Sequence, residues 1–334
     1  MKETLAHLFA HKYLTRAQSR ELLLNIAKGD VYPLSQVAAF LTVFNMRTIK
    51  VEELAGFRDA MLELCIRVDL SAYDPIDLCG TGGDGKNTFN ISTLASFIAA
   101  GAGVSVAKHG NYGVSSACGS SHVIEYLGGK FTNDSSHLHQ LMEESNICFL
   151  HAPLFHPAMK HVAPIRRELG IRTFFNMLGP LVNPAFPKQQ VTGVFSLELA
   201  RLYGYLFQET DTRYVILHAL DGYDECSLTG SCKVFSKTGE SLLTPQDFGY
   251  AALDPTELHG GDTIPEAAEI FMGVLQNEGT HAQEAAVLAN AGMAIMCAKG
   301  VSREEGIALA KESLDSGKAL STFKRFIHTS QLLN

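Results

Sequence analysis

Charged residues are scarce in this sequence. Only 19% of its 334 residues are Asp, Glu, Lys or Arg, whereas 46% are hydrophobic. No low-complexity tract occurs, and this composition argues against disorder. The net charge is −8, so the chain lacks the excess of basic residues that is typical of proteins that bind a nucleic-acid backbone. We therefore expect a folded protein of two domains, or one large domain with an attachment, that does not bind nucleic acid. The negative net charge is still compatible with a small polyanionic ligand, because a loop, a lysine and a divalent metal can balance the charge of such a ligand.

Other absences concern the cellular location. The seven cysteines form no Cys-x-x-Cys pair, whereas a disulfide or metal framework needs tighter grouping. The N-terminal stretch is interrupted by His7 and Lys12 and has no secretory apolar core. The uncharged run 91–107 is broken by Gly101 and Gly103 and is too short to span a membrane. These absences predict free thiols, no membrane association and a cytoplasmic location.

The hydrophobic pattern divides the chain into two parts. Up to about residue 65 it predicts four short helices, of which the second follows a capping box of Thr15 and Gln18 and ends at Gly29. From Pro75 the order becomes strand, glycine loop, helix, strand, which is typical of a parallel sheet. We expect strands over 75–79, 104–107, 147–150, 190–195 and 214–220, and helices over 93–101, 161–179 and from 265 onward. The sequence thus predicts an α/β domain with a helical domain attached.

The most informative motif is the glycine-rich loop Gly80-Thr-Gly-Gly-Asp-Gly85. Backbone N–H groups in such a loop can approach an anion closely. The glycines match a dinucleotide fingerprint, but the next strand ends in Lys108-His109 and not in the expected acid. The loop also matches a nucleotide P-loop, except that Asn87 stands where Ser or Thr is expected. A glycine turn without a ligand is a third interpretation.

A fourth interpretation includes the residues that follow the loop. The segment Asn90-Ile-Ser-Thr93 would begin a helix, where N–H groups and the helix dipole favour an anion. One strand later come Lys108-His-Gly-Asn-Tyr-Gly-Val-Ser-Ser116 and Ser120. Two adjacent strand ends would then place donors at the ligand crevice of an open parallel sheet. This arrangement suits a ligand with two separate phosphate groups.

In this order and spacing, the motifs resemble those of the anthranilate phosphoribosyltransferases. The similarity continues through 156–173, 176–184, Asp224-Glu225 and 315–320, so it covers essentially the whole chain. It implies transfer of the phosphoribosyl group from 5-phosphoribosyl 1-pyrophosphate to the amine of anthranilate, with release of pyrophosphate, in tryptophan biosynthesis.

The resemblance also implies an architecture. A small helical domain, 1–70 with a returning segment at about 165–190, would lie on a larger α/β domain, 71–164 and 191–334, with a mainly parallel central sheet. Two copies would form a homodimer through their helical domains.

Roles for individual residues follow from the resemblance position by position. For the phosphoribosyl substrate they are Gly80, Gly83, Asp84, Thr88, Asn90, Ile91, Ser92, Thr93, Lys108, Ser115, Ser116 and Ser120. For anthranilate they are Gly80, His109, Asn111 and Arg166, and Mg²⁺ is implied at Ser92, Asp224 and Glu225. No general base is implied, because an aromatic amine is neutral at pH 7 and attacks through its own lone pair. The departing pyrophosphate is what needs stabilisation.

Structural interpretations compete with these roles. Lys108 could be a solvated strand end, His109 a structural histidine and Arg166 part of a solvated helix face. The acids Asp224 and Glu225 could be ordinary loop residues.

One departure from the family pattern stands at 112–113, where this chain has Tyr-Gly and the family commonly has Arg-Ala. The loss of this cation beside the phosphate loop weakens substrate binding unless another group replaces it. The alternative functions are a pyrimidine nucleoside phosphorylase, a phosphoribosyltransferase with another aromatic acceptor, and a non-catalytic ribose-phosphate binding protein. The first of these is disfavoured because the phosphorylases usually have a lysine-histidine-serine loop, whereas this chain has Asn111 after Lys108-His-Gly. The pair of acids argues against the last.

Overall fold

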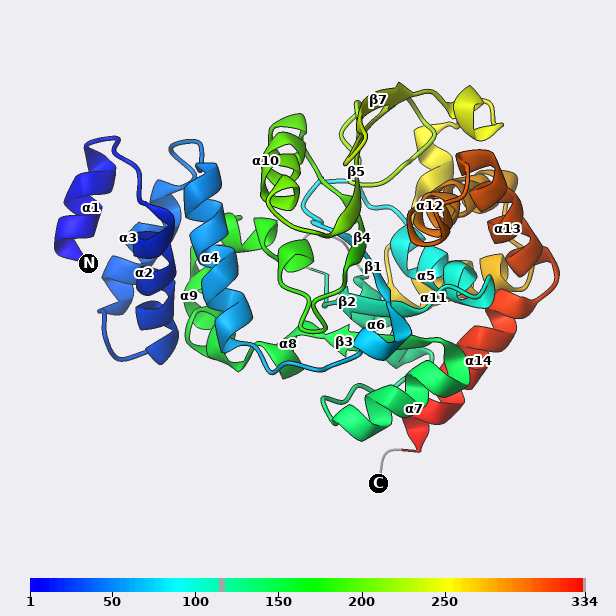
Figure 1. The fold of residues 1–334 in the computed structure, drawn as a ribbon, viewed down its shortest axis with the longest axis horizontal. Helices are drawn as coiled ribbons and strands as arrows, with labels where there is room; N and C mark the ends of the chain where they lie inside the picture. Colours follow the sequence, from blue (N-terminus) through cyan, green and yellow to red (C-terminus); the bar gives the residue numbers. More distant parts are fainter. Residues whose placement is uncertain (114–117, 333–334) are drawn as a thin grey trace.

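A bundle of helices lies beside a larger α/β part in the computed structural model, which describes residues 1–113 and 118–332 (Figure 1). The N-terminal helices are α1 (Lys2–Phe9), α2 (Arg16–Lys28), α3 (Leu34–Val43) and α4 (Val51–Leu64). The predicted capping box is confirmed, because Thr15 Oγ1 accepts from the N–H of Gln18 at 3.2 Å and Gln18 Oε1 accepts from the N–H of Thr15 at 2.9 Å. The predicted end of this helix at Gly29, with φ of +86°, is also confirmed.

The α/β part is built on one seven-stranded sheet. Its strands are β1 (Ile76–Gly80), β2 (Val106–Gly110), β3 (Ile147–His151), β4 (Gln189–Gly193), β5 (Arg213–Ala219), β6 (Cys232–Ser236) and β7 (Gly239–Leu243). The order across the sheet is β3-β2-β1-β4-β5-β6-β7, with the first five parallel and the last two antiparallel. The mainly parallel sheet is confirmed. The β6–β7 hairpin was not predicted, because β7 lies mostly in solvent and lacks an apolar pattern.

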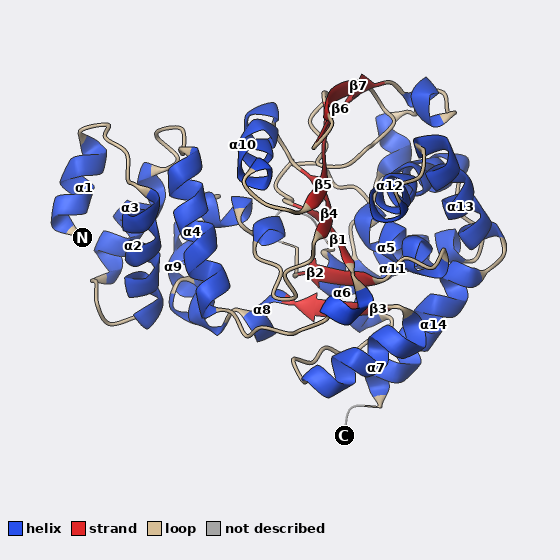
Figure 2. Cartoon of the chain, in the orientation of Figure 1, coloured by secondary structure: helices blue, strands red, loops and turns tan. Residues whose placement is uncertain are grey.

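Helices cover both faces of this sheet. The helices that follow α4 in the chain are α5 (Ile91–Gly101), α6 (Ser120–Tyr126), α7 (Ser135–Ser145), α8 (Ala152–Phe155), α9 (Ala163–Leu169), α10 (Leu197–Gln208), α11 (Ile264–Leu275), α12 (His281–Lys299), α13 (Arg303–Asp315) and α14 (Lys318–Gln331). The helices α5 and α11 to α14 lie on one side, and α10 with the N-terminal bundle lies on the other (Figure 2). No single helix in the described ranges is long and apolar enough to cross a membrane. Within the described part of the chain, α12 and α13 pass that test together, as a pair bent by 116°.

The segment 161–179 is not the single helix that was predicted. It contains the end of a 3₁₀ turn (Pro157–His161), the short helix α9 and a further 3₁₀ turn, Phe174–Met177. The chain leaves α9 at Gly170, whose φ of +64° cannot continue a right-handed helix. It returns to the N-terminal bundle, where the Phe174 ring stacks on Phe57 at 4.2 Å between centroids.

The strand order reverses between β1 and β4. The strand β1 lies between β2, which follows it in sequence, and β4, which comes much later. In open parallel sheets, such a reversal of strand order leaves a crevice at the carboxyl ends of the strands. The glycine loop and the acids after β5 meet at this crevice.

Candidate active site

Two glycines allow the loop after β5 to lie against the carboxyl ends of β1 and β4. A Cβ atom at Gly193 would stand 1.4 Å from the Asp224 carbonyl oxygen, and one at Gly80 would stand 2.5 Å from Asp224 Oδ2. Any larger residue at Gly193 would therefore displace this loop. The close approach brings acids from the far end of the sequence beside the glycine loop.

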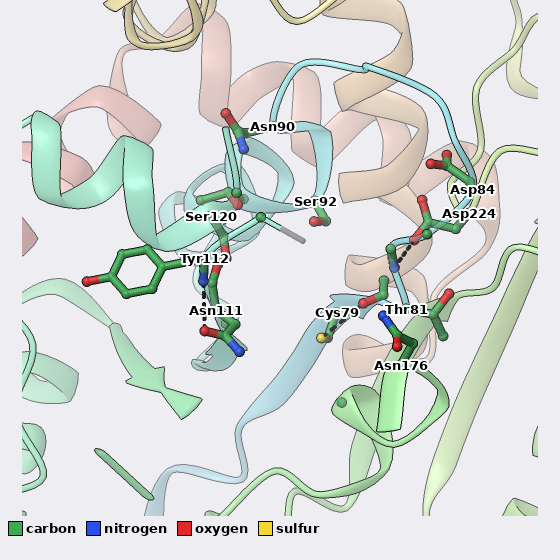
Figure 3. Close-up of a pocket in the computed structure, with 18 of the residues that line it drawn as sticks. Cys79, Thr81, Asp84, Asn90, Ser92, Asn111, Tyr112, Ser120, Asn176 and Asp224 are labelled. Atoms are coloured by element: carbon green, nitrogen blue, oxygen red, sulfur yellow. Dashed lines mark hydrogen bonds between the residues drawn. The ribbon is translucent and has the colours of Figure 1, made fainter. Parts of the chain in front are cut away.

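A cavity of about 270 Å³ opens at this place (Figure 3). It brings together most of the residues predicted from sequence: Gly80, Gly83, Asp84, Thr88, Asn90, Ser92, Thr93, Lys108, His109, Asn111, Ser120, Arg166, Asp224 and Glu225. Ile91 is not among them, because its side chain is fully buried in the core under α5. Ser115 and Ser116 lie outside the described residues. The helix α5 begins at Ile91, two residues earlier than predicted, so Ser92 lies in its first turn.

Lys108 is a buried residue inside β2, not a solvated strand end. The strand runs to Gly110, beyond the predicted end at 107. The side chain of Lys108 lines the cavity, and its Nζ donates to the carbonyl of Leu78 at 2.5 Å. Beneath it, the fully buried Asp77 accepts from the backbone N–H of His109 at 3.0 Å, and burial raises the pKa of this carboxyl to about 6. The structure thus places a cation at the floor of the cavity.

His109 is held as a neutral ring at the wall of the cavity. Its Nδ1 lies 3.0 Å from the carbonyl of Gly179, so Nδ1 carries the hydrogen and Nε2 carries the lone pair. His156 lies beside it, with 5.4 Å between ring centroids, and makes a similar contact from Nε2 to the carbonyl of Val182. Burial lowers the pKa of His109 to about 3 and that of His156 to about 4. Neither ring is charged at pH 7.

Three carboxyl groups gather in the same cavity. Asp224 Oδ2 accepts from the N–H of Gly82 at 2.7 Å, and Glu225 Oε1 accepts from the N–H of Ser92 at 3.1 Å. Figure 3 shows Asp84 next to Asp224. Burial, followed by the charge of Asp84, raises the pKa of Asp224 to about 7, and burial and Asp224 together raise the pKa of Glu225. A nearby cation would stabilise the ionised form of these carboxyl groups.

The acids could contribute ligands to a bound cation, but they are too few to form a metal site by themselves. The buried Glu225 Oε2 has no hydrogen-bond partner among the described residues. Within the same residues, no three His, Cys, Asp or Glu side chains are grouped closely enough to hold a metal ion by themselves. A metal here would need further ligands from a bound molecule.

Arg166 lies half-buried on α9, at the wall formed by the returning segment. Its Nη2 donates to Asn176 Oδ1 at 3.3 Å, and its guanidinium carbon stands 5.3 Å from the centre of the Phe175 ring. Burial lowers the pKa of this guanidinium. Arg166 is therefore not part of a fully solvated helix face. Asn176 and Phe175, which also line the cavity, were not singled out from sequence, although Asn176 begins one of the family segments.

Comparison with known proteins gives the same picture over the full length. The family model described as glycosyl transferase family, a/b domain, matches residues 72–320, and the one described as glycosyl transferase family, helical bundle domain, matches residues 2–65. An anthranilate phosphoribosyltransferase of Christiangramia forsetii is 58% identical over 331 residues, which are 99% of this chain and 100% of the relative.

Solved structures agree closely with this fold. The anthranilate phosphoribosyltransferase of Thermus thermophilus has a TM-score of 0.91 at 34% identity, covering 98% of this chain and 99% of that one. The Saccharomyces cerevisiae enzyme, solved in complex with PRPP and Mg, has a TM-score of 0.90 at 30% identity, covering 98% and 97%.

The raised pKa of Asp224 predicts a pH-dependent stability. Its folded pKa of about 7 lies above the ordinary value of 3.8, so the free energy of unfolding falls as pH rises between these two values. Asp224→Asn removes this titration and keeps an oxygen for the N–H of Gly82. In metal-free buffer at about pH 8, we expect the variant to be more stable than the parent protein by about 1–4 kcal/mol.

Urea unfolding at about pH 8 and about pH 4 measures this difference, which should nearly vanish at the lower pH. The exposed Asp211→Asn serves as the control and should change stability at neither pH. An equal gain for Asp224→Asn at both pH values would contradict the predicted titration.

Proposed function

Because the chain belongs to the anthranilate phosphoribosyltransferase family, we propose that it transfers the phosphoribosyl group of 5-phosphoribosyl 1-pyrophosphate to the amine of anthranilate. The products are N-(5-phosphoribosyl)anthranilate and pyrophosphate, and the step belongs to tryptophan biosynthesis. One observation carries the proposal. A single cavity combines a glycine loop and helix N-terminus suited to phosphate, a cluster of acids, and an arginine from α9.

The phosphoribosyl substrate would bind along the carboxyl ends of β1 and β2. Backbone N–H groups of the glycine loop and of the first turn of α5 are suited to phosphate oxygens. Lys108 adds a buried positive charge between these two donor groups. The side chains of Asn90, Ser92, Thr93 and Ser120 supply further donors from the same cavity, and by family resemblance Ser115 and Ser116 join them.

Magnesium fits the acidic end of the cavity. Mg²⁺ prefers carboxylate oxygens and commonly binds through one or two carboxylates together with substrate phosphates. Asp224 and Glu225 supply such oxygens, Ser92 lies beside them, and the unpartnered Glu225 Oε2 is a ready ligand. When bound, the metal neutralises the charge that develops on the departing pyrophosphate.

Anthranilate would lie between the ribose and the returning segment. Arg166 can form a two-point contact with its carboxylate. The amide of Asn111, the backbone at Gly80 and the lone pair of His109 Nε2 can orient the ring and its amine. In the reaction, the amine nitrogen forms a bond to C1 of the ribose, the bond from C1 to the pyrophosphate oxygen breaks, and the amine then loses a proton. The residues contribute position and charge, and no side chain needs to deprotonate the amine first.

We also propose that the molecule is a homodimer in the cytoplasm. The helical domain, 1–70 with about 165–190, exposes large apolar side chains: Phe9 is 60% exposed and Leu34 is 63% exposed. These residues lie on α1 and α3, which pack against each other, and large apolar side chains exposed on one domain are typical of an association surface. All seven cysteines are free, which supports a reducing compartment.

The acid pair provides the central test of the proposed reaction. Purified protein, magnesium and phosphoribosyl pyrophosphate should consume anthranilate, followed as loss of its fluorescence. We expect Asp224→Asn combined with Glu225→Gln to keep the fold and to lower turnover at least about a hundredfold, a loss of about 2.7 kcal/mol of transition-state stabilisation. Near-normal turnover would show that the acids are only loop residues. No turnover of the parent protein, together with phosphate-dependent cleavage of thymidine or uridine, would favour the phosphorylase instead.

Arg166 tests the acceptor site separately. Arg166→Ala should weaken anthranilate binding by about 1.5–3 kcal/mol, the contribution of a well-formed arginine–carboxylate pair. Because Arg166 comes from α9 and contacts Asn176 and Phe175, away from the glycine loop in sequence, the KM for phosphoribosyl pyrophosphate should change little. Steady-state kinetics with each substrate varied in turn measures the split, and an equal rise of both KM values would assign Arg166 to phosphate binding or to structure.

The oligomeric state tests whether the exposed apolar residues of the helical domain form a dimer interface. Sedimentation at micromolar concentration should give roughly twice the chain mass of 36.3 kDa. Leu34→Asp should shift the protein toward monomer because it places a charge on the proposed association surface. Leu242→Asp, at a residue 54% exposed on β7, should leave the dimer intact. A parent protein that is monomeric at every concentration would contradict the proposal.

A further inference from the structure

We propose that Tyr112 is a positioning residue that holds Asn111 and Ser120 in their places for the transfer reaction. The proposal rests on the function proposed above and concerns the position where this chain departs from the Arg-Ala of its family. Tyr112 lines the same cavity as Asn111 and Ser120. Its ring, however, points away from Asp84 and Asp224 (Figure 3).

The Tyr112 side chain joins the end of β2 to two other elements. Its hydroxyl donates to the carboxylate of Glu125 on α6, with distances of 3.0 and 3.2 Å to the two oxygens. Its ring centre stands 4.7 Å from that of His122 on α6 and 4.8 Å from that of His151 at the end of β3. One residue thereby connects three parts of the cavity wall.

The backbone of Tyr112 fixes the amide of Asn111. The N–H of Tyr112 donates to Asn111 Oδ1 at 2.8 Å. Since this oxygen is occupied, Nδ2 is the end of the amide that can donate to a carboxylate. The carbonyl of Asn111 in turn accepts from Ser120 Oγ at 3.2 Å and from the N–H of Ser121 at 3.1 Å. Asn111, proposed to bind the acceptor, and Ser120, proposed to bind phosphate, are therefore held as one unit.

Close packing makes this unit sensitive to Tyr112. A Cβ atom at Gly119 would stand 2.0 Å from the backbone nitrogen of Gly113 and 2.6 Å from the carbonyl carbon of Tyr112. The start of α6 thus rests directly on the backbone that follows Asn111. A shift of the Tyr112 backbone would move Ser120 as well.

The side chain of Tyr112 is neutral, whereas an arginine at this position would carry a positive charge. Burial and the neighbouring Glu125 both raise the pKa of the Tyr112 phenol, so it stays protonated and donates at pH 7. Tyr112 therefore acts through geometry and not by attracting phosphate charge. Glu125 is exposed on α6 and is not among the residues that line the cavity, so we expect it to act on the substrates through its contact with Tyr112.

The decisive experiment is a double-mutant cycle between Tyr112 and Glu125. Tyr112→Phe removes the hydroxyl and keeps the ring, whereas Glu125→Ala removes its acceptor. We expect each single variant to raise the KM for anthranilate about fivefold, as for the loss of one hydrogen bond, with kcat changed less than about twofold. Because both changes break the same contact, the double variant should be no worse than either single variant.

Two further variants separate positioning from a general loss of structure. Glu125→Gln keeps an oxygen that can accept from the phenol and should restore most of the anthranilate affinity. Tyr126→Phe removes a hydroxyl from the next residue of α6, which is 56% exposed, and should leave both KM values unchanged. Thermal unfolding of every variant shows that the fold is intact.

Unchanged KM values in both single variants, or effects that add in the double variant, would overturn the role of Tyr112 and leave the transferase function standing. If the parent protein itself did not turn over anthranilate, the proposed function and the role of Tyr112 would both be wrong.

Discussion

At the carboxyl ends of β1 and β4, backbone from three strands meets without intervening side chains. Gly193 leaves room for the carbonyl of Asp224, and Gly80 leaves room for its carboxylate. This steric constraint decides where the loop after β5 can lie. It brings a pair of acids to a glycine loop that precedes them by about 140 residues of sequence, as the contact of Gly82 with Asp224 shows. Without this approach, the phosphate donors and the acids would belong to separate surfaces.

The electrostatics of the site follow from the same proximity. The acids lie close together at one end, and the nearest buried histidines are neutral because burial lowers their pKa values. Lys108 brings a single amino group, hydrogen-bonded to the carbonyl of Leu78, against three carboxyl groups, and so it cannot balance the acids alone. The cavity therefore has a negative end and a cationic floor. That polarity suits a pyrophosphate that arrives with its metal and leaves with additional charge.

Much of this site could be predicted from sequence, because glycine spacing and helix-start residues report local backbone geometry. The loop 80–85, the helix start near Asn90 and the acids 224–225 carried such local signals. The contacts of Arg166 with Asn176 and of Tyr112 with Glu125 could not be predicted, since they depend on how separate elements pack. The burial of Lys108 was missed for the same reason, and the segment 161–179 was misjudged because Gly170 ends its helix early.

The stacking of Phe174 on Phe57 has a consequence for biosynthesis. The core of the N-terminal bundle includes Phe174 and also Tyr203 on α10. A ribosome must therefore have added more than half of the chain before the first four helices can bury their aromatic side chains. Until then these helices expose apolar surface, which is the condition under which chaperones bind nascent chains. The helical bundle is first in sequence but cannot be first to complete its core.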